Sequence, residues 1–156
     1  AWNEANTERL VRSYAGVAEL LTDLRAAGAA VAVATSKRRH PAAWALELTG
    51  LTDLVPVLVT MEDTAVHKPD PTPLRLAVAR AGGEPGRAAY IGDAVVDVQA
   101  ARAAGMTAIG VLWGAGTEAD VRAERPYAVA PSVAALRDLL LPGVPATAGP
   151  VGARVP

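Results

Sequence analysis

The sequence predicts an α/β fold in which a mostly parallel sheet is covered by helices on both faces. Short apolar runs of strand length alternate with amphipathic segments of helical length, which is the pattern of repeated βαβ units. Most of the amphipathic segments end at a glycine, a residue that commonly closes helices. A chain of 156 residues can bury one core, so a second full domain is not expected.

Five elements are expected in the first part of the chain. In order they are a helix over 2–12, a helix over 17–27, a strand over 29–35, a helix over 41–49 and a strand over 55–60. The helix over 2–12 begins abruptly and is separated from the next helix by a break at 14–16. The run 29–35 contains only alanine, valine and threonine, which indicates a strand buried on both faces.

The same alternation continues in the second part of the chain. In order we expect a helix over 73–81, a strand over 88–91, a helix over 95–104, a strand over 107–112, a short strand over 127–130 and a final helix over 133–141. Residues 142–156 are mostly proline, glycine, alanine and valine, which indicates a flexible tail. The expected parts are therefore a leading segment (1–15), an α/β core (16–141) and the tail (142–156).

The composition excludes several classes of function. A net charge of −1 gives no reason to expect a nucleic acid or an anionic membrane as partner. No apolar run approaches the roughly 20 residues that a membrane-spanning helix needs. The absence of cysteine excludes disulfides and thiol nucleophiles, and it suits a cytoplasmic protein. The oligomeric state is not indicated.

Polar residues follow the predicted strands at the points where a ligand site is expected. In open α/β sheets, ligands bind beyond the carboxyl ends of the strands. Thr35 and Ser36 come at the end of the first strand, and Asp93 follows the third. Lys68 precedes the helix that begins near residue 73. A hydroxyl pair, a lysine and an acid are thus expected at one edge of the sheet.

Each of these residues also has an ordinary structural explanation. Thr35 is a common strand residue, Ser36 suits a turn, and Lys68 could be a solvated loop lysine. The lysine count gives one reason to look further, because only Lys37 and Lys68 are lysines among the 15 basic residues. Lysine is a compact point charge that suits a narrow anion pocket, whereas arginine is a planar fork.

Asp93 and Asp97 are the pair of residues that most strongly suggests a metal site. Asp93 is expected at the N-cap of the helix over 95–104, and Asp97 lies four residues on, so both carboxylates should share one helical face. Like charges at that spacing cost roughly 0.2–0.5 kcal/mol unless something neutralises them. Magnesium, which prefers carboxylate oxygens and water, would do so. The alternative is that both acids only complement the positive end of the helix.

Several other residues are expected to be structural. His40 and His67 lack the spacing of metal ligands, and Trp113 is expected to pack in the interior. The glycine-rich segment 114–116 is too short for a dinucleotide-binding loop, and no acidic residue follows it at the expected spacing.

The order and combination of these motifs resemble the haloacid-dehalogenase-like hydrolases, most closely the phosphoglycolate-phosphatase-like branch. The segments that carry the resemblance are 31–37, 67–71, 90–97 and 101–106, and the likeness extends over about residues 1–141. The resemblance implies a Rossmann-like core and a magnesium-dependent phosphatase that acts on a small phosphorylated metabolite.

The resemblance also implies a role for each candidate residue. Thr35 would hydrogen-bond the phosphoryl group, helped by the backbone amide of Ser36. Lys68 would neutralise the phosphoryl charge and orient the nucleophile. Asp93 would hold Mg²⁺ directly, and Asp97 would do so directly, through water or through the lysine. Fixed positive charge of this kind stabilises the negative charge that develops during transfer.

One motif of the family is absent. The family's first motif is Asp-x-Asp at the end of an N-terminal strand, where the first aspartate forms an aspartyl-phosphate and the second is the general acid and base. No Asp-x-Asp occurs in this sequence. Residues 2–12 resemble the last helix of the family's helical cap. The sequence is therefore expected to be truncated, to lack the first, central strand and most of the cap, and to be inactive alone.

Two alternatives to a phosphate-monoester phosphatase remain open. One is an inactive, truncated paralogue that serves as an interaction module, and the other is an inorganic pyrophosphatase of the same superfamily. The missing central strand also predicts the spatial order of the sheet as 107–112, 88–91, a vacancy, 31–35 and 55–60. The vacancy should separate the inner strands by roughly 10 Å, so no ladder is expected between 31–35 and 88–91.

Overall fold

A computed structural model describes residues 11–144 of the chain. In order, the elements are α2 (Val17–Ala26), β1 (Ala32–Ala34), α3 (Arg39–Leu48), β2 (Val57–Val59), α4 (Thr72–Arg80), β3 (Ala89–Gly92), α5 (Val95–Ala104), β4 (Thr107–Val111), α6 (Glu118–Ala123), β5 (Ala128–Ala130) and α7 (Val133–Leu140). Two 3₁₀ turns, Thr52–Leu54 and Pro85–Arg87, complete the list. The helix expected over 2–12 falls almost wholly outside the described residues, as does most of the expected tail.

The strands are shorter than the sequence predicts, and β1 is the clearest case. The turn that closes α2 uses the first residues of the expected strand. The N–H of Ala29 donates to Leu24 O at 2.9 Å, and Gly28 adopts a left-handed conformation with φ of 86°. Since these backbone groups end a helix, the extended strand begins only at Ala32.

Helix α6 was not expected from the sequence. It has six residues, which is too few for a helical period to show in the pattern. The Thr117 side chain caps it by accepting a hydrogen bond from the N–H of Asp120. Its one fully buried side chain, Val121, anchors it to the rest of the fold.

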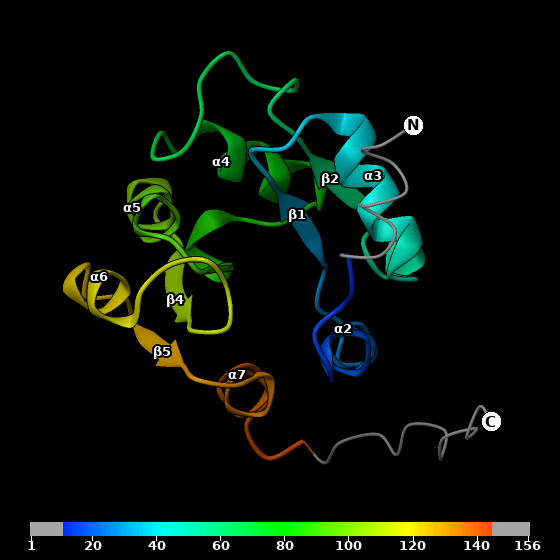
Figure 1. The fold of residues 1–156 in the computed structure, drawn as a ribbon, viewed down its shortest axis with the longest axis vertical. Helices are drawn as coiled ribbons and strands as arrows, with labels where there is room; N and C mark the ends of the chain where they lie inside the picture. Colours follow the sequence, from blue (N-terminus) through cyan, green and yellow to red (C-terminus); the bar gives the residue numbers. More distant parts are fainter. Residues whose placement is uncertain (1–10, 145–156) are drawn as a thin grey trace.

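The parallel sheet consists of two separate parts. Strand β1 pairs with β2, and the second part has the order β3-β4-β5. No ladder joins β1 to β3 within residues 11–144, as predicted, and β5 adds an outer strand beside β4. Figure 1 shows β1 and β2 beside α3, and β4 and β5 beside α6. We call the two parts the β1–β2 half-sheet and the β3–β5 half-sheet.

Two apolar clusters cover opposite faces of β4. One, which we call the α2–β4–α7 cluster, contains Leu20, Ile109, Val111, Ala130, Leu136 and Leu141. The other, the α4–α5–β4 cluster, contains Leu74, Val98, Ala100, Ala101, Ala104 and Ala108. Successive strand residues point to opposite faces, so Ile109 and Ala108 enter different clusters. The prediction of helices on both faces is confirmed.

The expectation that 29–35 forms a fully buried strand is wrong for the strand that is observed. Ala32 is exposed, and the other two residues of β1 are only half-buried. Among the described residues β1 pairs with β2 and with no other strand, so its second flank has no backbone ladder. None of the helices in residues 11–144 is long and apolar enough to span a bilayer.

Candidate active site

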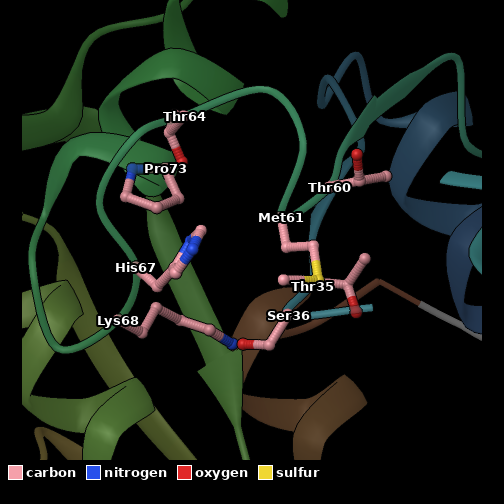
Figure 2. A pocket seen from close by; sticks show the side chains of 8 residues that line it. All are labelled: Thr35, Ser36, Thr60, Met61, Thr64, His67, Lys68 and Pro73. Carbon is pink, nitrogen blue, oxygen red and sulfur yellow. The ribbon is translucent and has the colours of Figure 1, made fainter. Parts of the chain in front are cut away.

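The carboxyl ends of β1 and β2, the segment before α4 and the first turn of α4 line a small pocket. Its lining residues are Thr35, Ser36, Thr60, Met61, Thr64, His67, Lys68 and Pro73 (Figure 2). The cavity volume is about 10 Å³, which is room for roughly one water-sized group. Three of the five predicted site residues therefore meet in one place, although their sequence positions span more than thirty residues.

The backbone around Thr35 is held in place by neighbouring segments. Its N–H donates to Val59 O at 2.9 Å, which continues the β1–β2 ladder beyond Ala34. Its side-chain oxygen accepts a hydrogen bond from the N–H of Lys37 at 3.1 Å. No acceptor for the hydroxyl proton lies among the described residues, so that proton is available to donate to an oxygen-rich ligand.

Lys68 is not a solvated loop lysine. Its side chain is only 12% exposed, and its Nζ lies 2.6 Å from Asp97 Oδ1 and 3.0 Å from the Tyr90 hydroxyl. Burial alone would lower the pKa of Lys68, but electrostatic attraction and hydrogen bonds from Tyr90 and Asp97 outweigh it and raise that pKa. Lys68 is therefore a fixed positive charge, and Figure 2 shows it pointing toward Ser36.

The expectation that Asp93 caps α5 and shares its face with Asp97 is wrong. The N-cap is Ala94, whose N–H donates to Asp97 Oδ2 at 3.1 Å, and Asp93 lies before the helix. Asp97 thus caps α5 from inside its first turn and is buried against Lys68. The lysine neutralises Asp97, so this carboxylate needs no metal for its charge balance.

Asp93 is held by the loop that follows β4. Its Oδ2 accepts a hydrogen bond from the N–H of Ala115 at 2.5 Å. A Cβ placed at Gly114 would collide with the Asp93 side chain, and one placed at Gly116 would collide with the Asp93 backbone. Only glycine permits these close approaches: Gly114 makes room for the Asp93 carboxylate, and Gly116 makes room for the Asp93 backbone that carries it.

The sequence contains a signal for this cradle. Gly114 and Gly116, which are separated by one residue, follow a predicted strand. Such a pair of glycines indicates a close approach of the backbone to another group, and not only a dinucleotide-binding loop. The neighbouring Trp113 packs against the α2–β4–α7 cluster, as expected, and its ring meets Tyr14 edge-on at 6.4 Å.

Asp63, which the sequence did not indicate as a site residue, holds the segment after β2 in place. Its carboxylate accepts hydrogen bonds from the N–H and hydroxyl of Thr60 at 2.8 and 2.7 Å. It also pairs with Arg39 at 2.6 Å and Arg80 at 2.9 Å. The hydrogen bonds from Thr60 and the nearby arginines hold the pKa of Asp63 well below its usual range. The contact ties this side of the pocket to α3 and α4.

The donor set around Asp93 is compatible with magnesium. Within residues 11–144, no three acidic, histidine or cysteine side chains form a metal-binding group. Magnesium, however, usually binds through one or two carboxylates together with waters and substrate phosphates. Asp93 forms no ion pair in the described part of the chain, and its one hydrogen bond there is accepted by Oδ2, so it can serve as that carboxylate.

Comparison with known proteins gives consistent matches. A family model described as haloacid dehalogenase-like hydrolase matches residues 1–111. Pyrophosphatase PpaX of Bacillus velezensis is 38% identical over 113 residues, which are 72% of this chain and 52% of the relative. A phosphoglycolate phosphatase of Xylella fastidiosa is 36% identical over 132 residues, covering 80% of this chain and 58% of the relative. The chain thus spans about half the length of these relatives.

Solved structures share the same fold. A hydrolase from Pseudomonas syringae has a TM-score of 0.79 and 26% identity, covering 87% of this chain and 63% of the other. An HAD phosphatase from Thermococcus onnurineus has a TM-score of 0.70 and 29% identity, covering 82% of this chain and 58% of the other.

Proposed function

Because this chain belongs to the haloacid dehalogenase-like hydrolases, we propose that the protein containing it hydrolyses phosphate monoesters of small cytoplasmic metabolites. The observation that carries this proposal is the buried Lys68–Asp97 pair placed beside Thr35 and Ser36. A fixed ammonium next to two hydroxyls at strand ends is suited to a phosphoryl group.

The residues of this chain would divide the work of binding. The Thr35 hydroxyl and the backbone amide of Ser36 would donate hydrogen bonds to phosphoryl oxygens. Lys68 would neutralise their charge, and Asp97 would keep the lysine charged and in place. Such preorganised donors stabilise the charge of the transition state without having to reorient during the reaction.

Asp93 would hold magnesium, with Asp97 acting on the site only through Lys68. Bound magnesium would act as a Lewis acid that polarises the phosphoryl oxygens. The cradle formed by Gly114 and Gly116 would fix the direction of the Asp93 carboxylate, since the N–H of Ala115 already holds one of its oxygens.

The nucleophile would be the first aspartate of an Asp-x-Asp motif, which this sequence does not contain. The 156-residue chain alone should therefore show no turnover of an aryl phosphate with magnesium. Phosphate release that copurifies with the chain and disappears in Asp93→Asn would overturn this part of the proposal.

An inorganic pyrophosphatase is the second candidate, because relatives named pyrophosphatase PpaX match as well as those named phosphoglycolate phosphatase. Phosphate release from phosphoglycolate and from pyrophosphate, measured on the protein that contains the chain with and without magnesium, separates the two.

Substitution of Lys68 tests the proposed site in either case. We expect Lys68→Arg to lower kcat at least tenfold, nearly as much as Lys68→Ala, because a planar fork does not fit a pocket shaped for an ammonium. A tenfold loss corresponds to about 1.4 kcal/mol. Lys37→Arg is the matched control, since the Lys37 side chain is exposed. A smaller loss in Lys68→Arg would show that only the charge matters.

A further inference from the structure

A second cavity lies at the opposite ends of the strands from the proposed active site. Its volume is about 200 Å³, and it is lined by the last turn of α5, the start of β4 and the segment 125–127 that leads into β5. The amino ends of parallel strands lie at the edge of a sheet opposite to their carboxyl ends, so this cavity is separate from Thr35 and Asp93. Among the described residues, none that lines it belongs to β1, β2 or β3, so its shape does not depend on the space between β1 and β3.

Both charged side chains that line the cavity are arginines, Arg102 and Arg125. Arg102 is held in place by Glu124 at the end of α6, because its Nη2 donates to the Glu124 backbone carbonyl and lies 3.4 Å from the carboxylate. These contacts leave its Nε and Nη1 donors for a ligand. The Arg125 side chain forms no ion pair or hydrogen bond with any residue in the described part of the chain. An arginine has five donors in a planar fork, so the two side chains together offer a strong site for an anion.

Arg125 occupies a backbone position that favours glycine. Its N–H donates to Arg122 O at 3.0 Å and closes α6, and its φ is 51°. Helices α2 to α5 are each closed instead by a glycine with positive φ, namely Gly28, Gly50, Gly82 and Gly105. Among residues 11–144, Arg125 is the one non-glycine residue with positive φ. A left-handed conformation strains a residue that has a Cβ, and such strain is found most often where a side chain has a function.

The rest of the cavity suits a flat apolar group. Met106, Ala108 and Pro126 line it together with Tyr127, whose side chain is 80% exposed. The Tyr127 backbone is fixed, because its N–H donates to Ala108 O at 2.9 Å. An exposed tyrosine ring beside two guanidinium groups is a favourable surface for the face or edge of another ring.

We propose that this cavity binds a small planar anion, an aromatic carboxylate with a single ring. Arg102 and Arg125 would bind the carboxylate, since the guanidinium fork matches its two oxygens. Met106, Pro126 and Tyr127 would contact the ring. A cavity of about 150 Å³ accommodates benzene, so the larger volume here leaves room for the carboxylate as well. The proposal goes beyond the phosphatase function and does not rest on it.

Calorimetric titration with benzoate tests the proposal on the protein that contains the chain. We expect one saturable site that binds benzoate at least about tenfold more tightly than benzyl alcohol, which lacks the charge. Arg125→Gly should weaken benzoate binding at least about tenfold without lowering the melting temperature, because glycine adopts a φ of 51° without strain. Arg122→Gln is the matched control, since it removes the same charge from α6 at a side chain that pairs with Glu118 and does not line the cavity.

Three results would overturn the proposal. They are the absence of saturable benzoate binding, an unchanged benzoate affinity in Arg125→Gly, and an equal loss of affinity in Arg122→Gln, which would indicate only general attraction to positive charge. Tyr127→Ala keeps the test decisive if Arg125→Gly is unstable, because an exposed side chain can be removed without disturbing the core. We expect Tyr127→Ala to weaken benzoate binding about fivefold, and an unchanged affinity there would also contradict the proposed site.

Discussion

The two half-sheets are stabilised by different forces. In the β3–β5 half-sheet, four of the five residues of β4 are buried between two apolar clusters. In the β1–β2 half-sheet, β1 has no fully buried residue, and the adjoining segment is held by the ion pairs and hydrogen bonds of Asp63. The β3–β5 half-sheet thus depends mainly on the hydrophobic effect, whereas the β1–β2 half-sheet, in which Val59 is fully buried, adds polar contacts that respond to pH and salt.

The largest loss of stability is expected from a substitution in the β3–β5 half-sheet. Ile109 is 3% exposed in the α2–β4–α7 cluster, so Ile109→Ala leaves a cavity and should cost about 2–5 kcal/mol of unfolding free energy. Urea denaturation measures the loss. Leu139→Ala on the exposed side of α7 is the control and should change stability little. Equal losses in both variants would contradict the assignment of the core.

We expect Asp63→Asn to destabilise the β1–β2 half-sheet. The substitution removes a charge that accepts two hydrogen bonds from Thr60 and pairs with two arginines, so we expect a loss of about 1.5–3 kcal/mol. The pKa of Asp63 is lower in the folded chain than its unfolded value of about 3.9. The stability that the Asp63 carboxylate contributes is therefore complete at pH values above its unfolded pKa, and it is lost as the pH falls from there toward the lower pKa of the folded chain. Denaturation at pH 7 and pH 3 should show the two proteins converging in acid.

The glycine cradle of Asp93 should be sensitive to a single methyl group. Gly114→Ala places a Cβ against the Asp93 side chain, so the loop must shift, at a cost of about 1–3 kcal/mol. Magnesium affinity, measured by calorimetry in the protein that contains the chain, should fall with it. Gly86→Ala is the matched control, because no atom lies within 4 Å of its added Cβ. Unchanged magnesium affinity in Gly114→Ala would separate the cradle from the metal.

The smallest effect is expected at the surface of the β3–β5 half-sheet. Glu118 and Arg122 form an ion pair one helical turn apart on α6, and both side chains are more than half exposed. Exposed pairs of this kind contribute about 0.3–0.5 kcal/mol. Glu118→Gln should thus be nearly neutral in urea denaturation. A loss above 1 kcal/mol would mean that charge supports this half as well.

Local patterns in the sequence predicted the elements well. Helix α5 has the predicted bounds, because its apolar period is regular and Gly105 closes it with φ of 79°. The missing ladder between β1 and β3 was predicted from the family resemblance and not from local patterns. Helix α6 was not predicted because six residues are too few to show a helical period. The N-cap of α5 was misplaced because the Asp97 carboxylate, three residues beyond the cap, supplies the capping contact.

The site could be predicted only in part, since its contacts join distant positions. Thr35, Ser36 and Lys68 were found because each lies at the end of a recognisable element. Tyr90 reaches Ala34 across 56 positions, and Ala115 reaches Asp93 across 22, so no spacing rule connects them. Such contacts depend on how the half-sheets pack, which a local pattern does not encode.

In the 156-residue chain, no backbone ladder joins β1 to β3 among the described residues, and this should affect how the chain opens. A backbone ladder distributes stability along two strands, whereas a side-chain contact, such as the 3.0 Å hydrogen bond from the Tyr90 hydroxyl to Ala34 O, acts at one point. The half-sheets should therefore behave as distinct cooperative units, with amides in β4 exchanging most slowly with solvent and those in β1 much faster. Thr35 belongs to one unit and Asp93 to the other. Each partial opening would consequently separate the phosphate-binding hydroxyl from the carboxylate and dismantle the site long before the chain unfolds.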